Sequence, residues 1–443
     1  MRLVVLVLGA CLLFVPLRGQ NLEAVVRPQI AGLVATYEDL HRHPELSHHE
    51  EKTSAFLAGE LRRAGYEVTE HVGKYPDGGA AYGIVAVMHN GSGPTLLIRT
   101  DMDALPVTEK TGLPYASTVR AVGEHGQEVG VMHACGHDIH MTVMLGVARS
   151  LAQLKNNWHG TLLLIGQPAE ERIDGARAML ADHLYERFGR PNYAIALHDD
   201  SELAAGTVGV VSGPLLASST SVDVWIRGLG GHGAHPDATR DPIVAAAQYI
   251  LAIQTIVSRQ NSPLDPAVVT VGDIHGGSKR NIIPDEVKLE LTVRAYSEQV
   301  RENILSDLSR TARGIALAAG IPEERSPIVK VIDGESVPAT YNDPVLAARL
   351  RPVFARWIGQ ENVLSPRPGM GSEDFGLFGL DNHEIPIFML RLGAVAPEKV
   401  AESRRTGRPL PSLHSSLFAP LPEPTIRTGV LTMTAAALNL LHP

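Results

Sequence analysis

Apolar residues follow two periodicities along the chain, and together these predict alternating strands and helices. Short, nearly continuous apolar runs are typical of strands buried on both faces, and they occur at residues 82–89, 95–99, 161–165 and 193–197. Helical spacing occurs at residues 139–154 and 175–188, with two more helices expected within residues 23–64. The alternation predicts an α/β fold whose mostly parallel sheet is covered by helices on both faces.

The pattern changes after Gly213-Pro214. Strands and helices follow in a different order, with strands at residues 221–227, 267–273 and 287–296 and helices at 242–259 and 299–320. This predicts a small α+β unit of the ferredoxin-like kind. From Asp343 a helix, a strand at 385–392 and a terminal helix from Pro424 follow. We expect a catalytic domain (21–215 and 334–443) interrupted by an inserted domain (216–333).

The N-terminal segment has the pattern of an export signal. Arg2 precedes an apolar run at residues 3–17, which is shorter than the roughly 20 residues that span a bilayer, and a polar stretch follows. We expect residues 1–20 to be removed during export to the periplasm or the extracellular space, leaving no membrane span. Cys135 would then be the remaining cysteine, so no intramolecular disulfide is expected.

Charge narrows the choice of partner. The chain of 443 residues carries a formal net charge of −9 and has no Lys/Arg-rich run, which excludes a nucleic-acid-binding class. A small-molecule substrate is the expected partner.

Side chains that bind transition metals gather in two tracts. Residues 133–140 read His-Ala-Cys-Gly-His-Asp-Ile-His, and residues 167–171 read Gln-Pro-Ala-Glu-Glu. Thiolate, imidazole and carboxylate form a ligand set for a transition metal. Asp101, the glutamate pair and His198 each follow a predicted strand, and the carboxyl ends of parallel strands meet at one edge of a sheet. The sequence therefore predicts a metal centre at this edge.

The adjacent Glu170 and Glu171 are expected to have different roles. One carboxylate of the pair Glu170 and Glu171 is expected to bind metal while the other takes a proton from metal-activated water. The rival interpretation is a Cys-His nucleophilic pair made by Cys135. That rival leaves the glutamates, His198 and His414 without roles.

A series of ordered motifs extends from His41 to the C-terminal region: His41-Arg42-His43-Pro44-Glu45-Leu46, residues 99–106, residues 132–140, residues 167–171, residues 230–236, residues 281–285 and Gly371-Ser372-Glu373-Asp374-Phe375. With these motifs the chain resembles the amidohydrolase branch of the metal-dependent aminoacylase and carboxypeptidase family, which includes hippurate hydrolases and indoleacetyl-amino-acid hydrolases. The resemblance implies a dinuclear-metal catalytic domain and an inserted lid domain that usually dimerises.

The resemblance also assigns roles. Two divalent ions per subunit, Mn²⁺ or Zn²⁺ with Co²⁺ or Ni²⁺ as further options, would be held by Cys135, His137, Glu171, His198 and His414. Glu170 would be the general base, and Asp101 would orient a ligand imidazole. Three residues of the inserted domain would contact the substrate. His232 would polarise the scissile carbonyl or its oxyanion, reaching the site of the neighbouring subunit in a dimer or acting within its own subunit. Asn281 and Arg294 would bind the substrate carboxylate.

The expected function is metal-dependent hydrolysis of the amide bond of N-acyl amino acids or related small amides by a homodimer or higher homo-oligomer. An exported dipeptidase or carboxypeptidase is the alternative within enzymes, and a non-catalytic binding protein on the same scaffold is the alternative of another class. The chain departs from the family after His198, where Asp199-Asp200-Ser201 replaces a pattern ending in Pro.

Overall fold

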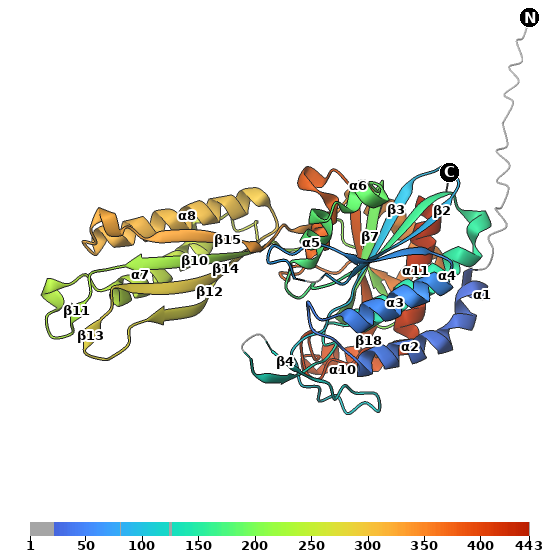
Figure 1. Cartoon of the computed structure of the whole chain (residues 1–443), viewed down its shortest axis with the longest axis horizontal. Coiled ribbons are helices and arrows are strands. Elements are labelled where there is room, and N and C mark those ends of the chain that lie inside the picture. The colour runs from blue at the N-terminus through green and yellow to red at the C-terminus, as the bar shows by residue number, and fades with distance from the viewer. Residues whose placement is uncertain (1–21, 80, 124–125, 443) are drawn as a thin grey trace, which may run out of the picture.

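The computed structural model describes residues 22–79, 81–123 and 126–442, so the expected export signal lies outside the described residues. Two sheets lie at different places along the long axis of the molecule (Figure 1). A larger unit contains an eight-stranded sheet, and a smaller unit built on a four-stranded sheet extends away from it.

The eight strands of the large sheet lie in the order β1 (Glu67–Val72), β2 (Gly83–Asn90), β6 (Gly160–Gln167), β3 (Thr95–Asp101), β7 (Tyr193–Ala204), β18 (Ile387–Val395), β8 (Val208–Gly209) and β17 (Val363–Leu364). The four central strands β6, β3, β7 and β18 are parallel, while β1, β2 and β8 pair antiparallel with their inner neighbours. The expectation of an α/β fold with a mostly parallel sheet is confirmed.

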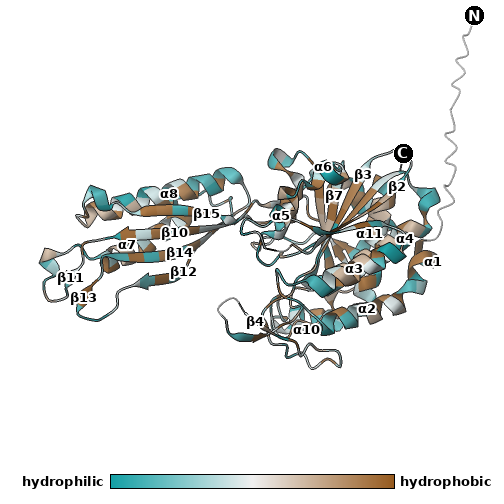
Figure 2. Cartoon of the chain, in the orientation of Figure 1, coloured by the Kyte–Doolittle hydropathy of each residue, from teal (hydrophilic) through white to brown (hydrophobic). Residues whose placement is uncertain are grey.

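Both faces of this sheet are buried, as the apolar runs predict. Alternate side chains enter different cores: Leu96 and Ile98 lie in one, and Leu97 lies in the other. In Figure 2 the strands of this sheet are predominantly in the hydrophobic colour. The sheet therefore needs a helical layer on each side to exclude water.

The two helical layers differ in size. Helices on the first face contribute to the larger core: α1 (Leu22–Val26), α2 (Ile30–Arg42), α3 (Glu51–Arg63), α4 (His137–Gln153), α9 (Pro344–Ile358) and α11 (Pro422–Leu440). The second face is covered by α5 (Gly175–Ala181), α6 (Leu184–Phe188) and a 3-10 helix at Asp374–Gly379. A further helix, α10 (Pro397–Thr406), follows β18.

Two elements differ from their predicted form. The helix expected at residues 175–188 is divided into α5 and α6, because His183 takes a left-handed conformation with φ of 58° between them. The strand expected to end at Leu197 continues as β7 to Ala204, paired with β18.

The smaller unit has the ferredoxin-like order. Its sheet runs β12 (Ala267–Gly276), β14 (Glu286–Ala295), β10 (Ser219–Arg227) and β15 (Ile328–Val337), with every neighbouring pair antiparallel. Helices α7 (Pro242–Thr255) and α8 (Glu298–Ala318) pack on one face of the sheet, where Val222, Val224 and Ile226 alternate with less buried residues. Asp241 and Ser297 cap these helices, accepting hydrogen bonds from main-chain N–H groups.

Short strand pairs complete the fold. The chain passes between the units through β9 (Gly213–Leu216) and β16 (Thr340–Asn342), which pair with each other. The boundary expected after Asp333 falls inside β15, so the smaller sheet runs a few residues farther. Two small antiparallel pairs also form: β4 (Arg120–Val122) with β5 (Glu128–Gly130), and β11 (Gly231–His232) with β13 (Ile282–Ile283).

Among the described residues, no helix has the length and apolar character that crossing a membrane requires.

Candidate metal centre

The carboxyl ends of the central strands bring the expected metal ligands together. Asp101, the last residue of β3, pairs with Gln167, the last residue of β6. The glutamate pair follows β6, and His198 lies on the neighbouring β7. The prediction that His198 ends its strand is wrong, because β7 continues beyond it. The prediction that these residues share one edge of the sheet agrees with the register.

Cys135 and His137 reach the same edge from the start of α4. Gly136 between them has a φ of 78° and is the N-cap residue directly before the helix. A Cβ atom at this position would lie 2.0 Å from Oδ2 of Asp199. Glycine is therefore required here both by the left-handed backbone and by the approach of Asp199.

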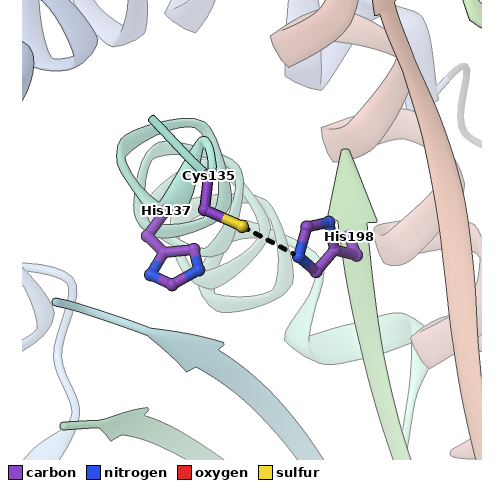
Figure 3. A group of neighbouring side chains, drawn as sticks. All are labelled: Cys135, His137 and His198. Carbon is purple, nitrogen blue, oxygen red and sulfur yellow. Dashed lines mark hydrogen bonds between the residues drawn. The ribbon is translucent and has the colours of Figure 1, made fainter. Parts of the chain in front are cut away.

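The sulfur of Cys135 is buried at the middle of the cluster. Its Sγ lies 3.6 Å from Nε2 of His198 and 3.3 Å from Nε2 of His414. Figure 3 shows Cys135 and His137, from the beginning of α4, facing His198 on β7. Nε2 of His414 is also 3.5 Å from Oε2 of Glu171. Side chains from four separate segments thus converge within ligand distance of a common point.

Unpaired polar atoms show that this cluster fits a cation. Nδ1 of His137 is hydrogen bonded to the main-chain oxygen of Asp103 at 2.8 Å, so Nε2 is the free nitrogen. This buried Nε2 and the buried Oε1 of Glu171 have no hydrogen-bond partner among the described residues, although they are 3.9 Å apart. Buried polar atoms without partners are costly, and a divalent ion would satisfy both. The donor set of sulfur, imidazole nitrogen and carboxylate oxygen suits a transition metal.

Two buried carboxylates fix the backbone that presents the glutamate pair. Asp103 accepts hydrogen bonds from the main-chain N–H groups of Glu170 and Glu171, at 3.1 and 3.0 Å. Glu50 accepts one from the N–H of Ala169 at 2.8 Å, and Ala169 has a φ of 48°. Sequence reasoning missed these roles of Asp103 and Glu50. Asp103 lies within the motif at residues 99–106, which was the available signal.

Burial sets the protonation of the two glutamates. Burial raises the pKa of Glu170 well above its usual range, and the carboxylates of Glu373 and Glu171 raise that pKa further. Burial also raises the pKa of Glu171 to about 7, although the charge of His137 acts in the opposite direction. Glu170 is therefore a stronger base than an exposed carboxylate, as proton transfer near neutral pH requires.

The thiol of Cys135 is not prepared for nucleophilic attack. Burial raises the pKa of Cys135 well above its usual range, and the carboxylates of Glu171 and Glu170 raise that pKa further. A sulfur in such surroundings keeps its proton unless a cation stabilises the thiolate. This environment favours metal ligation over the Cys-His nucleophile.

The expected role of Asp101 needs correction. Its Oδ1 is hydrogen bonded to Nδ1 of His140 at 2.7 Å, and its Oδ2 accepts from Arg99 at 2.5 Å. The imidazole that Asp101 orients therefore belongs to His140, which is not one of the expected ligands. The ligand His137 is oriented instead by the main-chain oxygen of Asp103, a contact that a motif of side chains does not reveal.

A network of buried hydrogen bonds connects the motif at residues 371–375 to the carboxyl-end edge of the large sheet. Arg99 donates to Glu373 at 2.7 Å and to Asp374 at 3.0 Å, and Gln167 donates to Asp374 at 2.7 Å. All four side chains are buried. The motif at residues 371–375 is thereby fixed against the ends of β3 and β6.

The motif that begins at His41 contacts the helix α4, which carries the ligand His137. His41 is buried, with Nδ1 at 2.6 Å from Asp138 and Nε2 at 3.2 Å from Glu109. Burial alone would lower the pKa of His41, but its hydrogen bonds to Asp138 and Glu109 raise that pKa to about 9. His41 is therefore a cation that links α2 to the first turn of α4.

A cavity of about 530 Å³ opens onto the cluster, and it is lined in part by Cys135, Glu170, Glu171, His198, His414 and Arg294. Arg294 comes from β14 of the smaller unit, and it donates to the main-chain oxygen of Met370 at 3.1 Å. Burial lowers the pKa of this guanidinium. The expected carboxylate-binding arginine thus lies in the same cavity as the ligands.

The other two substrate-contacting residues lie elsewhere. His232 on β11 and Asn281 beside β13 are exposed at the end of the smaller unit farthest from the large sheet, which we call the tip (Figure 1). The structure of one chain therefore joins eight of the ten predicted residues at the cluster or its cavity, and leaves His232 and Asn281 apart from them.

Comparison with known proteins agrees with this geometry. A model of the family described as peptidase family M20/M25/M40 matches residues 97–404. N-acetyl-L-cysteine deacetylase of Bacillus subtilis is 36% identical over 347 residues, which are 78% of this chain and 77% of that relative. Hippurate hydrolase of Campylobacter jejuni is 36% identical over 357 residues, 79% of this chain and 87% of that relative.

A solved structure gives the same result at the level of the fold. The YXEP protein of Bacillus subtilis, described as a dinuclear metal-binding peptidase from the M20 family, matches with a TM-score of 0.74 and 28% identity over 94% of this chain and 99% of that one. The expected resemblance and the expected enzyme class are both confirmed. The chain belongs to peptidase family M20/M25/M40 and is a metal-dependent hydrolase of amide bonds.

Proposed function

We propose that this protein hydrolyses the amide bond between an acyl group and the nitrogen of an amino acid, giving a carboxylic acid and a free amino acid. The observation that carries the proposal is one cavity whose lining combines Glu170 and Arg294 with four of the five proposed ligands, Cys135, Glu171, His198 and His414. The names of two relatives, N-acetyl-L-cysteine deacetylase and hippurate hydrolase, describe substrates of this class.

Five side chains would hold two divalent ions: Cys135, His137, Glu171, His198 and His414. When bound, such ions supply Lewis acidity that activates water and polarises an amide carbonyl. The chain contributes the fixed geometry of the donors, because Asp103 and Glu50 hold the backbone before and at the glutamate pair.

Glu170 is the proposed proton carrier. Its raised pKa lets the carboxylate accept a proton from water at neutral pH and keep it long enough to deliver it to the leaving nitrogen. The amide C–N bond then breaks, with the hydroxyl of water on the acyl carbon and its proton on the amine.

Arg294 supports an anionic substrate. Its NH1 group donates a hydrogen bond to the main-chain oxygen of Met370 and lies 3.4 Å from the hydroxyl of Ser372. Among the described residues, no carboxylate forms a salt bridge with Arg294. A half-buried guanidinium whose charge is not neutralised favours a bound carboxylate, such as that of an acylated amino acid.

The lining of the cavity disfavours a dipeptide as the substrate. Among the described residues, the carboxylates that line it are Glu170, Glu171 and Asp199. Glu170 and Glu171 face the metal-ligand cluster, and Asp199 lies against the ring of the ligand His198. None is left to bind the α-ammonium group that a dipeptide carries.

The test is turnover of a substrate panel by the purified protein loaded with Mn²⁺ or Zn²⁺. We expect hydrolysis of N-acetyl and N-benzoyl amino acids, and much slower hydrolysis of the corresponding amino-acid amides and of unblocked dipeptides. Faster turnover of unblocked dipeptides would contradict the proposal. Metal binding without turnover of any amide would favour a binding protein instead.

Two ions per subunit are proposed, with Mn²⁺ or Zn²⁺ as the native metals and Co²⁺ or Ni²⁺ as further options. The donor set is compatible with each of them, because selection among such ions follows availability as well as affinity. Elemental analysis of protein purified without added metal should find about two ions per chain. A value of one ion or fewer would contradict a dinuclear centre.

A homodimer through the smaller unit is also proposed, with residues 216–333 acting as a lid. Strand β12 is at an edge of its sheet, and α7 beside it exposes Val244 and Leu251 at 54% and 73%. An open strand edge next to exposed apolar side chains favours association with a second copy. Analytical ultracentrifugation should give a dimer, and Leu251→Asp should weaken it. A monomeric wild-type protein would contradict this proposal.

Export is proposed from the sequence of residues 1–20 alone. N-terminal sequencing of the protein recovered from a periplasmic or extracellular fraction should show that this segment has been removed. Recovery of the uncleaved chain from the cytoplasm would contradict export.

A further inference from the structure

Asp199 is a buried carboxylate that the proposed reaction does not use. It follows the ligand His198 on β7, and its side chain is fully buried. Its Oδ1 lies 3.3 Å from Nδ1 of His198 and 3.4 Å from Nε2 of His140. Neither carboxylate oxygen has a well-formed hydrogen bond among the described residues. A buried carboxylate in this state is unfavourable unless charges nearby compensate it.

The surroundings of Asp199 point towards the metal centre. Its Oδ2 packs against Gly136, the N-cap residue of α4, where the helix dipole favours a negative charge. Nδ1 of His198 is hydrogen bonded to the main-chain oxygen of Asp199 at 2.8 Å. Nε2 on the opposite side of the ring faces Cys135. The carboxylate and the proposed cation therefore lie on opposite sides of the same imidazole.

This arrangement defines the tautomer of the ring. A proton on Nδ1 is stabilised by the main-chain oxygen and by the carboxylate beside it, which leaves the lone pair of Nε2 free for a cation. A negative charge behind the ring also favours a cation bound to that lone pair.

We propose that Asp199 is a positioning residue for the metal centre, whose carboxylate holds His198 with Nε2 directed at the cation and supplies a buried negative charge that tightens binding of a divalent transition metal. The inference rests on the metal centre of the proposed function. It assigns to Asp199 a role outside the five proposed ligands.

The next residue provides a matched control. Asp200 is also buried on β7, but its Oδ2 is 2.5 Å from NH2 of Arg391, so its charge is neutralised by a guanidinium. Asp199→Asn and Asp200→Asn remove the same charge from adjacent positions while keeping nearly the same volume. Only the first change alters the environment of a proposed ligand.

The experiment measures metal affinity without substrate. The full-length apoprotein and both variants compete with a chelating dye for Zn²⁺ and for Mn²⁺. We expect Asp199→Asn to bind about 10- to 100-fold more weakly than the wild type, as loss of a carboxylate behind a ligand imidazole does elsewhere. Asp200→Asn should stay within about 2-fold on the same scale. Equal affinities of the wild type and a folded Asp199→Asn would overturn the inference.

The design separates this inference from the proposed function. If the wild type binds no divalent ion, the metal centre itself fails; if the wild type binds tightly and Asp199→Asn equally so, only the role of Asp199 fails. Circular dichroism of the apoproteins shows whether the variants are folded, and Asp199→Ser is a smaller substitution if Asn is not tolerated.

A crystal structure of the metal-loaded wild type gives an answer that depends on no variant. The expected result is His198 bound to the metal through Nε2, with Asp199 beside its Nδ1. Ligation through Nδ1, or an Asp199 side chain turned away from His198, would overturn the inference.

Discussion

The metal centre and the tip of the smaller unit hold residues assigned to one reaction, but only the metal centre is assembled within a single chain. At the centre, buried side chains from distant segments are fixed by hydrogen bonds to further buried groups. At the tip, His232 and Asn281 are exposed, and the ring of His232 accepts a hydrogen bond from the main-chain N–H of Ala234 at 3.0 Å and lies beside the ring of His235. The difference supports the proposal that one chain suffices to bind the ions, whereas a catalytic role of the tip would need a second surface.

The largest expected effect is at the centre. Glu170→Gln should lower kcat by about 10²- to 10⁴-fold, because the amide side chain cannot carry a proton from water to the leaving nitrogen. Metal content, measured by elemental analysis, should stay unchanged. Glu171→Gln is the matched control, since it should lose metal as well as activity. Turnover of Glu170→Gln close to that of the wild type would contradict the assignment.

A substitution at the tip should separate activity from metal binding. His232→Ala should lower kcat by about 10²- to 10³-fold, the effect of removing one donor to a developing oxyanion, with no change in metal affinity. Mixing this variant with Glu170→Gln under conditions of subunit exchange should restore part of the activity, because some mixed dimers contain one intact site. No recovery despite proven exchange would mean that His232 does not act across the interface.

The buried charges of the larger unit should also make its stability depend on pH. His41 has a folded-state pKa of about 9 against an ordinary value of 6.5, so its stabilising contribution is complete below pH 6.5 and is lost as the pH rises through 9. The contribution is on the order of 3 kcal/mol. Urea unfolding of the apoprotein should show a loss of stability between pH 6.5 and 10 that is smaller in His41→Gln. Equal losses in the two proteins would contradict this role.

The smallest effect is expected at Arg294, which the smaller unit contributes to the cavity of the same chain. Arg294→Lys keeps the charge but loses the planar fork, so KM for an N-acyl amino acid should rise about 10-fold, equivalent to roughly 1.4 kcal/mol. KM for the corresponding amino-acid amide, which has no carboxylate, should change little. A similar rise for both substrates would mean that Arg294 does not bind the carboxylate.

The buried apolar strands and the amphipathic helices were predictable because local periodicity encodes burial. The end of β7 was not, since the polar run Asp199-Asp200-Ser201 reads as a loop, yet pairing with β18 keeps it in the sheet. The two-residue strands β8 and β17 are too short to leave a pattern. The break at His183 carries no glycine or proline signal.

In the candidate site, too, only the features with a local pattern could be predicted from the sequence. Cys135, His137 and the glutamate pair could be found from their spacing, because neighbouring ligands on one loop leave a local signal. His414 had no local argument, and only the resemblance pointed to it. The roles of Glu50 and His140, and the pairing of Asp101 with His140, depend on contacts between segments far apart in the sequence. Spacing along a chain does not encode such contacts.

The close approach of Asp199 to Gly136 restricts the order in which this sequence can change. While Asp199 is present, alanine at position 136 would place its Cβ 2.0 Å from a carboxylate oxygen, so that substitution would force the buried Asp199 side chain to move. Once residue 199 is smaller, the obstacle falls to the backbone strain of the left-handed conformation, about 1 to 2 kcal/mol. A mutational route that alters position 199 first therefore meets only the backbone strain, whereas the reverse route must also displace a buried carboxylate.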